Sequence, residues 1–209
     1  MRRKKRNKRT GKFTYSIIVD GETEIWYFQM MKKHENLHRI DIRPEIPRKK
    51  KLKEQFELVC EYAENYDMVI WLIDFDTLLK EHNERKRGTI SIIKKFEKYR
   101  SALERKYLNR VKVLVNSPCL EYWYLLHFIK TDTFYQKCNE PIKKLKNQYM
   151  TDYKKSEKFY KKRDNDIYER LKPKQSEAMQ NAKDLGAFDF GKINSAKAEI
   201  YKILEILGI

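Results

Sequence analysis

Two aspartates separated by one residue follow an apolar run and offer the first sign of chemistry. The run is MVIWLI at residues 68–73, and the acids are Asp74 and Asp76. Such a run, rich in Val, Ile and Trp, is typical of a buried strand, whose side chains alternate between the two faces of the sheet. We therefore expect both carboxylates on one side of the strand end, roughly 7 Å apart at their backbones. This spacing would let them bind one hard cation.

Two further acids are expected at the same edge of the sheet. Asp20 follows an expected strand at residues 13–19, and Glu121 lies in the first turn of the helix after an expected strand at 111–115. The carboxyl ends of parallel strands form one edge, where α/β proteins bind ligands. Crowded carboxylates repel one another unless a cation such as Mg²⁺ or Mn²⁺ is bound. Acids at strand ends also serve as loop caps, so a purely structural role stays open.

The charge of the chain points to a polyanionic partner. Lys and Arg number 47 against 30 Asp and Glu, a net charge of +17 in 209 residues. Such an excess favours binding to DNA or RNA, although a solvated, charged helix surface would give the same composition. A small acidic site on a basic protein suggests metal chemistry on a phosphodiester backbone.

The cysteines and the apolar runs bear on location. Cys60, Cys119 and Cys138 are odd in number and lack CxxC spacing, which predicts neither a disulfide framework nor a zinc site and fits a reducing cytoplasm. The basic amino terminus is not followed by the apolar segment of a signal peptide. No apolar run approaches the roughly 20 residues that cross a bilayer, so no membrane partner is expected.

The pattern along the chain predicts strands that alternate with helices. That rhythm indicates an α/β fold, a mostly parallel sheet with helices on both faces, spanning residues 13–130. Residues 1–12 are expected to be a basic, disordered arm, and 131–209 a helical region without strands that packs on the core. Expected strands are 13–19, 39–43, 68–73 and 111–115; expected helices are 25–31, 52–63, 92–103, 119–128, 143–170, 176–185 and 200–207; 20–24 is expected to be a turn and 80–87 a charged loop.

Several single residues have local interpretations. Ser117 is expected to be the N-cap of the helix that Pro118 begins. His127 lies in an apolar segment, which favours a buried, hydrogen-bonded histidine over a ligand. The aromatic residues of the basic segment have two open interpretations, stacking on unpaired bases or packing in the core; they are Tyr149, Tyr153, Phe159 and Tyr160.

The chain resembles the RloB-like proteins of the TOPRIM superfamily in several ordered motifs. IIVDGETE at residues 17–24, followed by Tyr27 and Phe28, resembles the opening motif, and Asp74-Phe75-Asp76 matches the second. The most distinctive match is NSPCLEYW at 116–123 with LLHF at 125–128, and weaker ones are YKK at 153–155 and AMQNAK at 178–183. The resemblance implies a TOPRIM-like (Rossmann-like) fold, Mg²⁺-dependent phosphoryl transfer, and a prokaryotic anti-phage role beside a partner ATPase.

Our interpretation is a metal-dependent nuclease of TOPRIM type. TOPRIM proteins usually carry Glu where this chain has Asp20, which is one methylene shorter and would either draw the ion deeper or leave Glu24 to act as base. The rival is a nucleic-acid-binding or sensor subunit that does not cleave and acts through the ATPase; a topoisomerase or primase would need a longer chain. The expected roles are catalytic for Asp20, Glu24 and Lys155, metal binding for Asp74, Asp76, Asp20 and Glu121, and nucleic-acid binding for Arg2, Arg3, Lys4, Lys5, Lys154, Lys158, Lys161 and Lys162.

Overall fold

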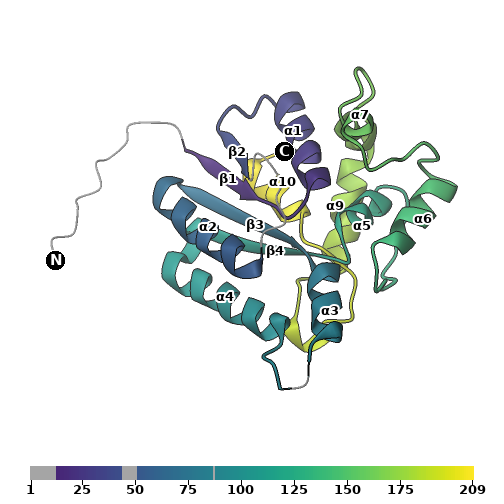
Figure 1. Cartoon of the computed structure of the whole chain (residues 1–209). Helices are drawn as coiled ribbons and strands as arrows, with labels where there is room; N and C mark the ends of the chain where they lie inside the picture. The colour runs from purple at the N-terminus through teal and green to yellow at the C-terminus, as the bar shows by residue number, and fades with distance from the viewer. Residues whose placement is uncertain (1–12, 44–50, 87) are drawn as a thin grey trace.

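The computed structural model describes residues 13–43, 51–86 and 88–209, and these residues contain a five-stranded sheet (Figure 1). The strand order is β2-β1-β3-β4-β5, and all neighbours are parallel except β4 and β5. The predicted mixed α/β class is confirmed. The predicted arm, with Arg2, Arg3, Lys4 and Lys5, lies outside the described residues. The strands are β1 (Tyr15–Ile18), β2 (Ile40–Arg43), β3 (Met68–Asp74), β4 (Val111–Ser117) and β5 (Lys197–Ala198).

Helices cover both faces of the sheet because the strand side chains alternate between two apolar clusters. Ile70 and Leu72 of β3 belong to one cluster, whereas Trp71 and Ile73 belong to the other. In Figure 1, α2 and α4 lie together on one side of the strands and α1 lies on the opposite side. The first face is covered by α1 (Glu22–His34), α5 (Leu120–Leu126), α9 (Gln175–Asp184) and α10 (Tyr201–Leu207), and the second by α2 (Leu52–Asn65), α3 (Phe75–Glu84) and α4 (Ile92–Tyr107).

The C-terminal region shares the core of the first face. Its remaining α-helices are α6 (Asn139–Gln148), α7 (Glu157–Tyr160) and α8 (Ile167–Leu171). Tyr153, Phe159 and Tyr160 are buried in the cluster that holds α1 and α5, so they are core residues and do not present their rings to bases. Tyr149 is half-buried and stacks on Phe128. Among the described residues, no helix combines the length and apolarity that crossing a membrane requires.

The prediction that no strand follows residue 130 was wrong. The two-residue strand β5 pairs antiparallel with Asn116 and Ser117 at the end of β4. The side chain of Glu199, fully buried, accepts hydrogen bonds from the backbone N–H groups of Val115 at 3.0 Å and Phe188 at 3.2 Å. A strand of two residues has no alternating pattern, so its sequence carries no strand signal.

The expected geometry of the two aspartates was also wrong. β3 ends at Asp74, and α3 begins at Phe75, so Asp76 lies in the first turn of a helix rather than on the strand. An acid in the first turn of a helix is favoured by the positive end of the helix dipole. The predicted loop at 80–87 was wrong for residues 80–84, because α3 continues to Glu84, whereas residues 85 and 86 lie outside any helix or strand. The helical spacing of the buried residues Phe75, Leu78 and Leu79 was the signal for this helix.

Two predictions near the end of β4 were wrong as well. Ser117 is not a helix N-cap: it is the last residue of β4, fully buried, and Cys119 occupies the N-cap position of α5. The strand continues through Ser117 because β5 pairs with it. Cys119 and Cys138 form a disulfide, against the prediction that none is present. These cysteines are 19 residues apart and meet because the connection between α5 and α6 returns to the start of α5, a closure that spacing in sequence does not reveal.

Candidate metal site

Four carboxylates from four different elements converge at the carboxyl edge of the sheet. Glu24 comes from the first turn of α1, Asp74 from the end of β3, Asp76 from the start of α3 and Glu121 from the first turn of α5. A cavity of about 900 Å³ opens beside them, and Glu24, Asp74 and Asp76 are part of its wall. The edge that the sequence predicted to carry the acids therefore has a concave site.

Burial and neighbouring acids disfavour the charged forms of Asp74 and Glu24. The Oδ2 atom of Asp74 accepts a hydrogen bond from the N–H of Leu120 at 3.2 Å, whereas Oδ1 is buried and receives no donor from the described residues. Burial and the charges of Glu24, Asp76 and Glu121 raise the pKa of Asp74 well above its usual value. Burial and the charge of Glu121 also raise the pKa of Glu24.

Asp76 is more open and better supplied with donors. Burial and the charge of Glu121 raise its pKa, while the backbone N–H groups of Cys138 and Thr77 and the charge of Lys155 oppose that rise. The N–H of Asp76 itself donates to the carbonyl of Pro118 at 3.1 Å, which joins the start of α3 to the end of β4. This hydrogen bond fixes the backbone of Asp76 relative to the end of β4.

Glu121 is buried behind the cavity and holds Lys155. Its Oε1 atom lies 2.7 Å from Nζ of Lys155 and accepts a hydrogen bond of 2.7 Å from the hydroxyl of Tyr153. The side chain of Glu121 is 1% exposed and that of Lys155 is 45% exposed, so the ammonium reaches the cavity wall while its partner stays inside. Burial would lower the pKa of Lys155, but the charges of Glu121, Glu24 and Asp74 outweigh burial and raise it. The Lys155 ammonium thus offsets part of the negative charge of Glu121, Glu24 and Asp74.

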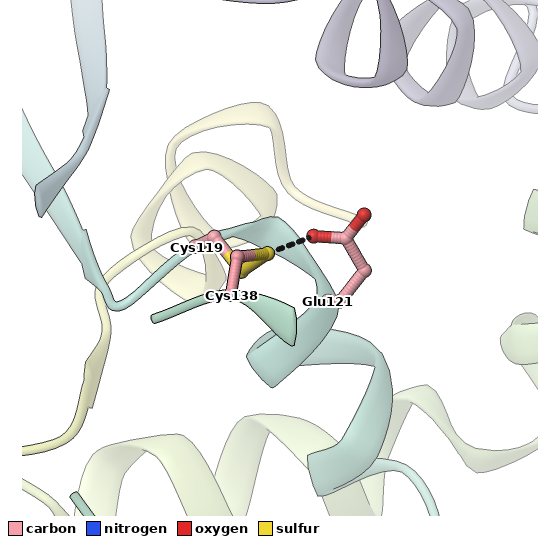
Figure 2. A group of neighbouring side chains, drawn as sticks. All are labelled: Cys119, Glu121 and Cys138. Carbon is pink, nitrogen blue, oxygen red and sulfur yellow. Dashed lines mark hydrogen bonds between the residues drawn. A yellow bond between two sulfur atoms is a disulfide. The ribbon is translucent and has the colours of Figure 1, made fainter. Parts of the chain in front are cut away.

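The other oxygen of Glu121 faces the disulfide (Figure 2). Its Oε2 atom lies 2.9 Å from Sγ of Cys138, and Figure 2 shows the carboxylate pointing at that sulfur. A disulfide sulfur carries no hydrogen, so this is a close contact between two electron-rich atoms and not a hydrogen bond. Cys119 and Cys138 both form part of the cavity wall.

Asp20 lies on the wall of the same cavity but faces α2. Its Oδ1 atom accepts a hydrogen bond from Nε2 of Gln55 at 2.8 Å, and Oε1 of Gln55 accepts one from Nε1 of Trp71 at 2.9 Å. Trp71 belongs to the cluster on the α2 side of the sheet, whereas Glu24 lies on α1. Glu24, rather than Asp20, is thus the acid of the opening motif that meets Asp74.

Gly21 leaves room for the carboxylate of Glu24. Its backbone is extended, with φ −137°. A Cβ atom built at this position would lie 2.5 Å from Oε2 of Glu24. A larger residue at this position would force the carboxylate of Glu24 to move, and the glycine is not needed for a backbone angle that only glycine adopts.

The basic residues at the cavity differ from those that the sequence singled out. Of the predicted nucleic-acid-binding residues, Lys154, Lys158 and Lys162 are exposed, and Lys161 pairs with Glu157 at 2.6 Å. The cavity wall instead has four cations that sequence reasoning missed, Lys51, Lys80, Arg85 and Lys95, in addition to Lys155. For Lys80 and Arg85 the signal was the basic run after Asp76, which was assigned to a loop.

His127 and the hydroxyl of Tyr153 both have structural roles, and only that of His127 was predicted. His127 is buried, its Nδ1 atom lies 2.9 Å from the carbonyl of Trp123, and burial lowers its pKa to about 4, so the prediction of a structural histidine is confirmed. The hydroxyl of Tyr153 supports Glu121, a role that neither of its two interpretations included. Its position two residues before Lys155 in the YKK motif was the only signal.

The donor set of the site suits a hard divalent cation. Mg²⁺ and Mn²⁺ prefer oxygen ligands, and carboxylates whose pKa values are raised by mutual repulsion gain most from a bound cation. The buried Oδ1 atom of Asp74, which lacks a donor among the described residues, could act as such a ligand. Asp76 and Glu24 lie on the same cavity wall, although in this arrangement the ligand atoms of the three acids do not all lie within 4.8 Å of one another.

The fold and this site define an α/β protein with an acid-lined cavity at the carboxyl edge of a mostly parallel sheet. A family model described as RloB-like protein matches residues 15–207, nearly the whole chain, so the protein belongs to the RloB-like family. Comparisons with curated proteins and with solved structures gave no significant match.

Proposed function

We propose that the protein is a metal-dependent nuclease of TOPRIM type that cleaves nucleic-acid phosphodiester bonds in anti-phage defence. The observation that carries this proposal is the convergence of Glu24, Asp74 and Asp76, with raised pKa values, beside a cavity that also has basic side chains on its wall. Carboxylates would hold Mg²⁺ or Mn²⁺, and cations would hold the phosphate backbone. The motifs shared with TOPRIM proteins favour the same chemistry.

Each residue of the site has a distinct role in this proposal. Asp74, Asp76 and Glu24 would bind the metal ion, which when bound lowers the pKa of a water molecule and neutralises charge on the phosphate oxygens. Glu121, held by Tyr153, would orient Lys155. Lys155 would then contact the phosphate and stabilise its charge during cleavage.

Asp20 has a separate role because it faces α2. Its bond to Gln55 fixes its carboxylate at the cavity wall, where it would orient an attacking water rather than bind the first ion. The departure from the usual Glu at this position favours a second candidate function, a subunit that binds nucleic acid without cleaving it and acts with a partner ATPase. In that case Asp20, in place of the usual Glu, would leave the site able to bind but unable to react.

Metal binding and cleavage are tested on the same pair of proteins. The parent and an Asp74→Asn/Asp76→Asn variant are titrated with Mg²⁺ and Mn²⁺ in a thermal-shift assay. They are also incubated with tRNA, single-stranded DNA and duplex DNA, with each metal or with EDTA. We expect the metals to raise the melting temperature of the parent by mass action and to support cleavage, and the variant to lose both effects. Asp164→Asn, at an exposed acid far from these contacts, is the matched control.

The outcomes separate the two candidate functions. If the double variant still cleaves, the nuclease assignment to this site is wrong. If the parent binds metal and nucleic acid but cleaves none of the substrates, the binding-subunit function takes its place. If the parent shows no metal response up to millimolar concentration, with or without nucleic acid, the metal site itself is rejected.

A further inference from the structure

The disulfide between Cys119 and Cys138 lies in the wall of the proposed active site rather than in a remote part of the fold. Cys119 is the N-cap residue of α5, two residues before Glu121, and Cys138 is the N-cap residue of α6. Both sulfurs belong to residues on the cavity wall. A disulfide at an opening to solvent is accessible to thiols and oxidants, unlike one that is enclosed in a core.

Cys138 contacts three of the residues that the site needs. Its backbone N–H lies near the carboxylate of Asp76 and opposes the rise in the pKa of that acid, its Sγ atom lies 2.9 Å from Oε2 of Glu121, and Nζ of Lys155 lies 3.8 Å from the same sulfur. The position of this single residue therefore influences an acid of the metal site and both members of the ion pair behind it.

The segment before Cys138 has no regular secondary structure. Residues 129–137 connect α5 to α6 without helix or strand. The hydroxyl of Tyr122 donates to the carbonyl of Thr131 at 2.7 Å, Tyr135 is buried against the ring of Tyr122, and Ile129 and Phe134 pack against the two apolar clusters. Lys130 also pairs with Asp184 at 2.5 Å. The bond to Cys119 adds a covalent restraint at the end of the segment, where it meets the site.

We propose that Cys119 and Cys138 form a reversible redox pair that controls the metal site through the position of Cys138. The oxidised pair holds the N–H of Cys138 against Asp76, and reduction releases it. The pair itself stands on the positions of the two cysteines, whereas its effect on metal binding rests on the proposed function.

Reduction and reoxidation of this disulfide require a dithiol as the reductant and a peroxide as the oxidant. A dithiol attacks the partly exposed Cys138 sulfur, the S–S bond breaks, and Cys119, which is 2% exposed, leaves as a thiolate and takes a proton. The second thiol of the reductant then closes its own disulfide and releases Cys138 as a thiol. In the reverse direction, hydrogen peroxide oxidises one thiol to a sulfenic acid with loss of water, and the other thiol displaces a second water to reform the bond.

The test compares the oxidised and reduced forms of the full chain. After treatment with dithiothreitol or with peroxide, the protein is alkylated without denaturant and weighed, its hydrogen exchange is followed at residues 129–138, and its melting temperature is titrated with Mg²⁺. We expect reduction to expose the two thiols of the pair and to speed exchange in this segment. We also expect it to raise the half-maximal Mg²⁺ concentration by about tenfold, the scale on which the partners of metal ligands act. Peroxide should restore all three readouts.

Matched variants assign these effects to the pair. Cys60→Ser removes the free cysteine and should keep the full redox response. Cys119→Ser/Cys138→Ser should behave like the reduced form under both treatments, and Cys138→Ser alone should do the same if the double variant fails to fold. The proposal is overturned if the pair resists dithiothreitol, or if the two forms exchange and bind Mg²⁺ alike. If exchange changes but neither form responds to Mg²⁺, the redox pair stands and the proposed function fails.

Discussion

The two ends of helix α1 each carry a cluster of titratable side chains, and the clusters are built in opposite ways. At its last residue, His34 lies 2.7 Å from Oδ2 of Asp166, and Glu169 lies beside them. Oδ1 of Asp166 accepts hydrogen bonds of 3.0 Å from the N–H groups of Tyr168 and Glu169. Every oxygen of this buried carboxylate has a partner, so Asp166 is the N-cap of α8 and joins α8 to α1.

At the first turn of α1, Glu24 meets Asp74, which has one oxygen without such a partner among the described residues. Oδ1 of Asp74 receives no hydrogen bond from any described donor, and burial and neighbouring charges raise the pKa values of both residues. Both clusters contain the residue types that bind metals. The difference between them is the supply of donors, which identifies one carboxylate as a helix cap and the other as a ligand that requires a cation.

The largest expected effect on stability comes from removing Asp166, the carboxylate that acts as a helix cap. Asp166→Ala removes two bonds to backbone N–H groups and the bond to His34, so we expect the free energy of unfolding to fall by about 2–3 kcal/mol. Asp74→Asn keeps an oxygen for the N–H of Leu120 and removes a repelling charge. The metal-free Asp74→Asn variant should therefore be at least as stable as the parent. Urea unfolding at pH 7 in EDTA measures both.

Cleavage per folded molecule completes the test of these two variants. Asp166→Ala should retain it, and Asp74→Asn should lose it together with the response to Mg²⁺. If Asp74→Asn were instead destabilised as much as Asp166→Ala, Asp74 would be a structural cap, and the contrast between the two clusters would disappear.

The strands that position the acids of this site could be predicted from the sequence. The apolar runs of β3 and β4 are long enough to be recognised as strands, and parallel strands bring their carboxyl ends to one edge. The convergence of Asp74, Asp76 and Glu121 at that edge was therefore predictable from their positions after strands. The match to the family extends over the same segments.

The details that decide which acids meet were not predictable in the same way. Asp-x-Asp fits both a strand end and the first turn of a helix, so local pattern does not separate the two. Asp20 and Glu24 belong to one motif, yet Asp20 faces α2 and Glu24 faces Asp74, a division that depends on the packing of whole helices. The disulfide depends on a return of the chain, which no local rule describes.

A smaller effect is expected in the dependence of stability on pH. The pKa values of Glu24, Asp74 and Asp76 are raised above their ordinary values of 4.5, 3.8 and 3.8. Above about pH 4 these three carboxyl groups therefore bind more protons in the folded protein than in the unfolded chain, and their contribution to the stability of the metal-free protein should fall as the pH rises through the window up to the folded pKa values. Asp74→Asn should flatten this loss, and saturating Mg²⁺ should reverse it because the metal binds the ionised acids.

The measurement is the difference in melting temperature between Asp74→Asn and the parent from pH 4 to pH 8 in EDTA. A difference is needed because His127, whose pKa burial lowers to about 4, removes stability from both proteins as the pH falls below 6.5. The difference should grow in favour of the variant as the pH rises. A constant difference would mean that Asp74 does not titrate abnormally, and the acid cluster would lose its distinction from Asp166.

The smallest expected effect concerns which basic surface guides nucleic acid to the acid cluster. Lys80 and Lys95 are exposed on the cavity wall, whereas Lys158 and Lys162 are exposed on and just after α7. Each phosphate contact contributes roughly 0.7 to 0.9 to the slope of log affinity against log salt concentration. We expect Lys80→Gln/Lys95→Gln to flatten that slope by up to about 1.8 when both lysines contact phosphates. Lys158→Gln/Lys162→Gln, which removes the same charge, should change it less. The reverse result would move the binding path to α7 and restore the residues that the sequence first indicated.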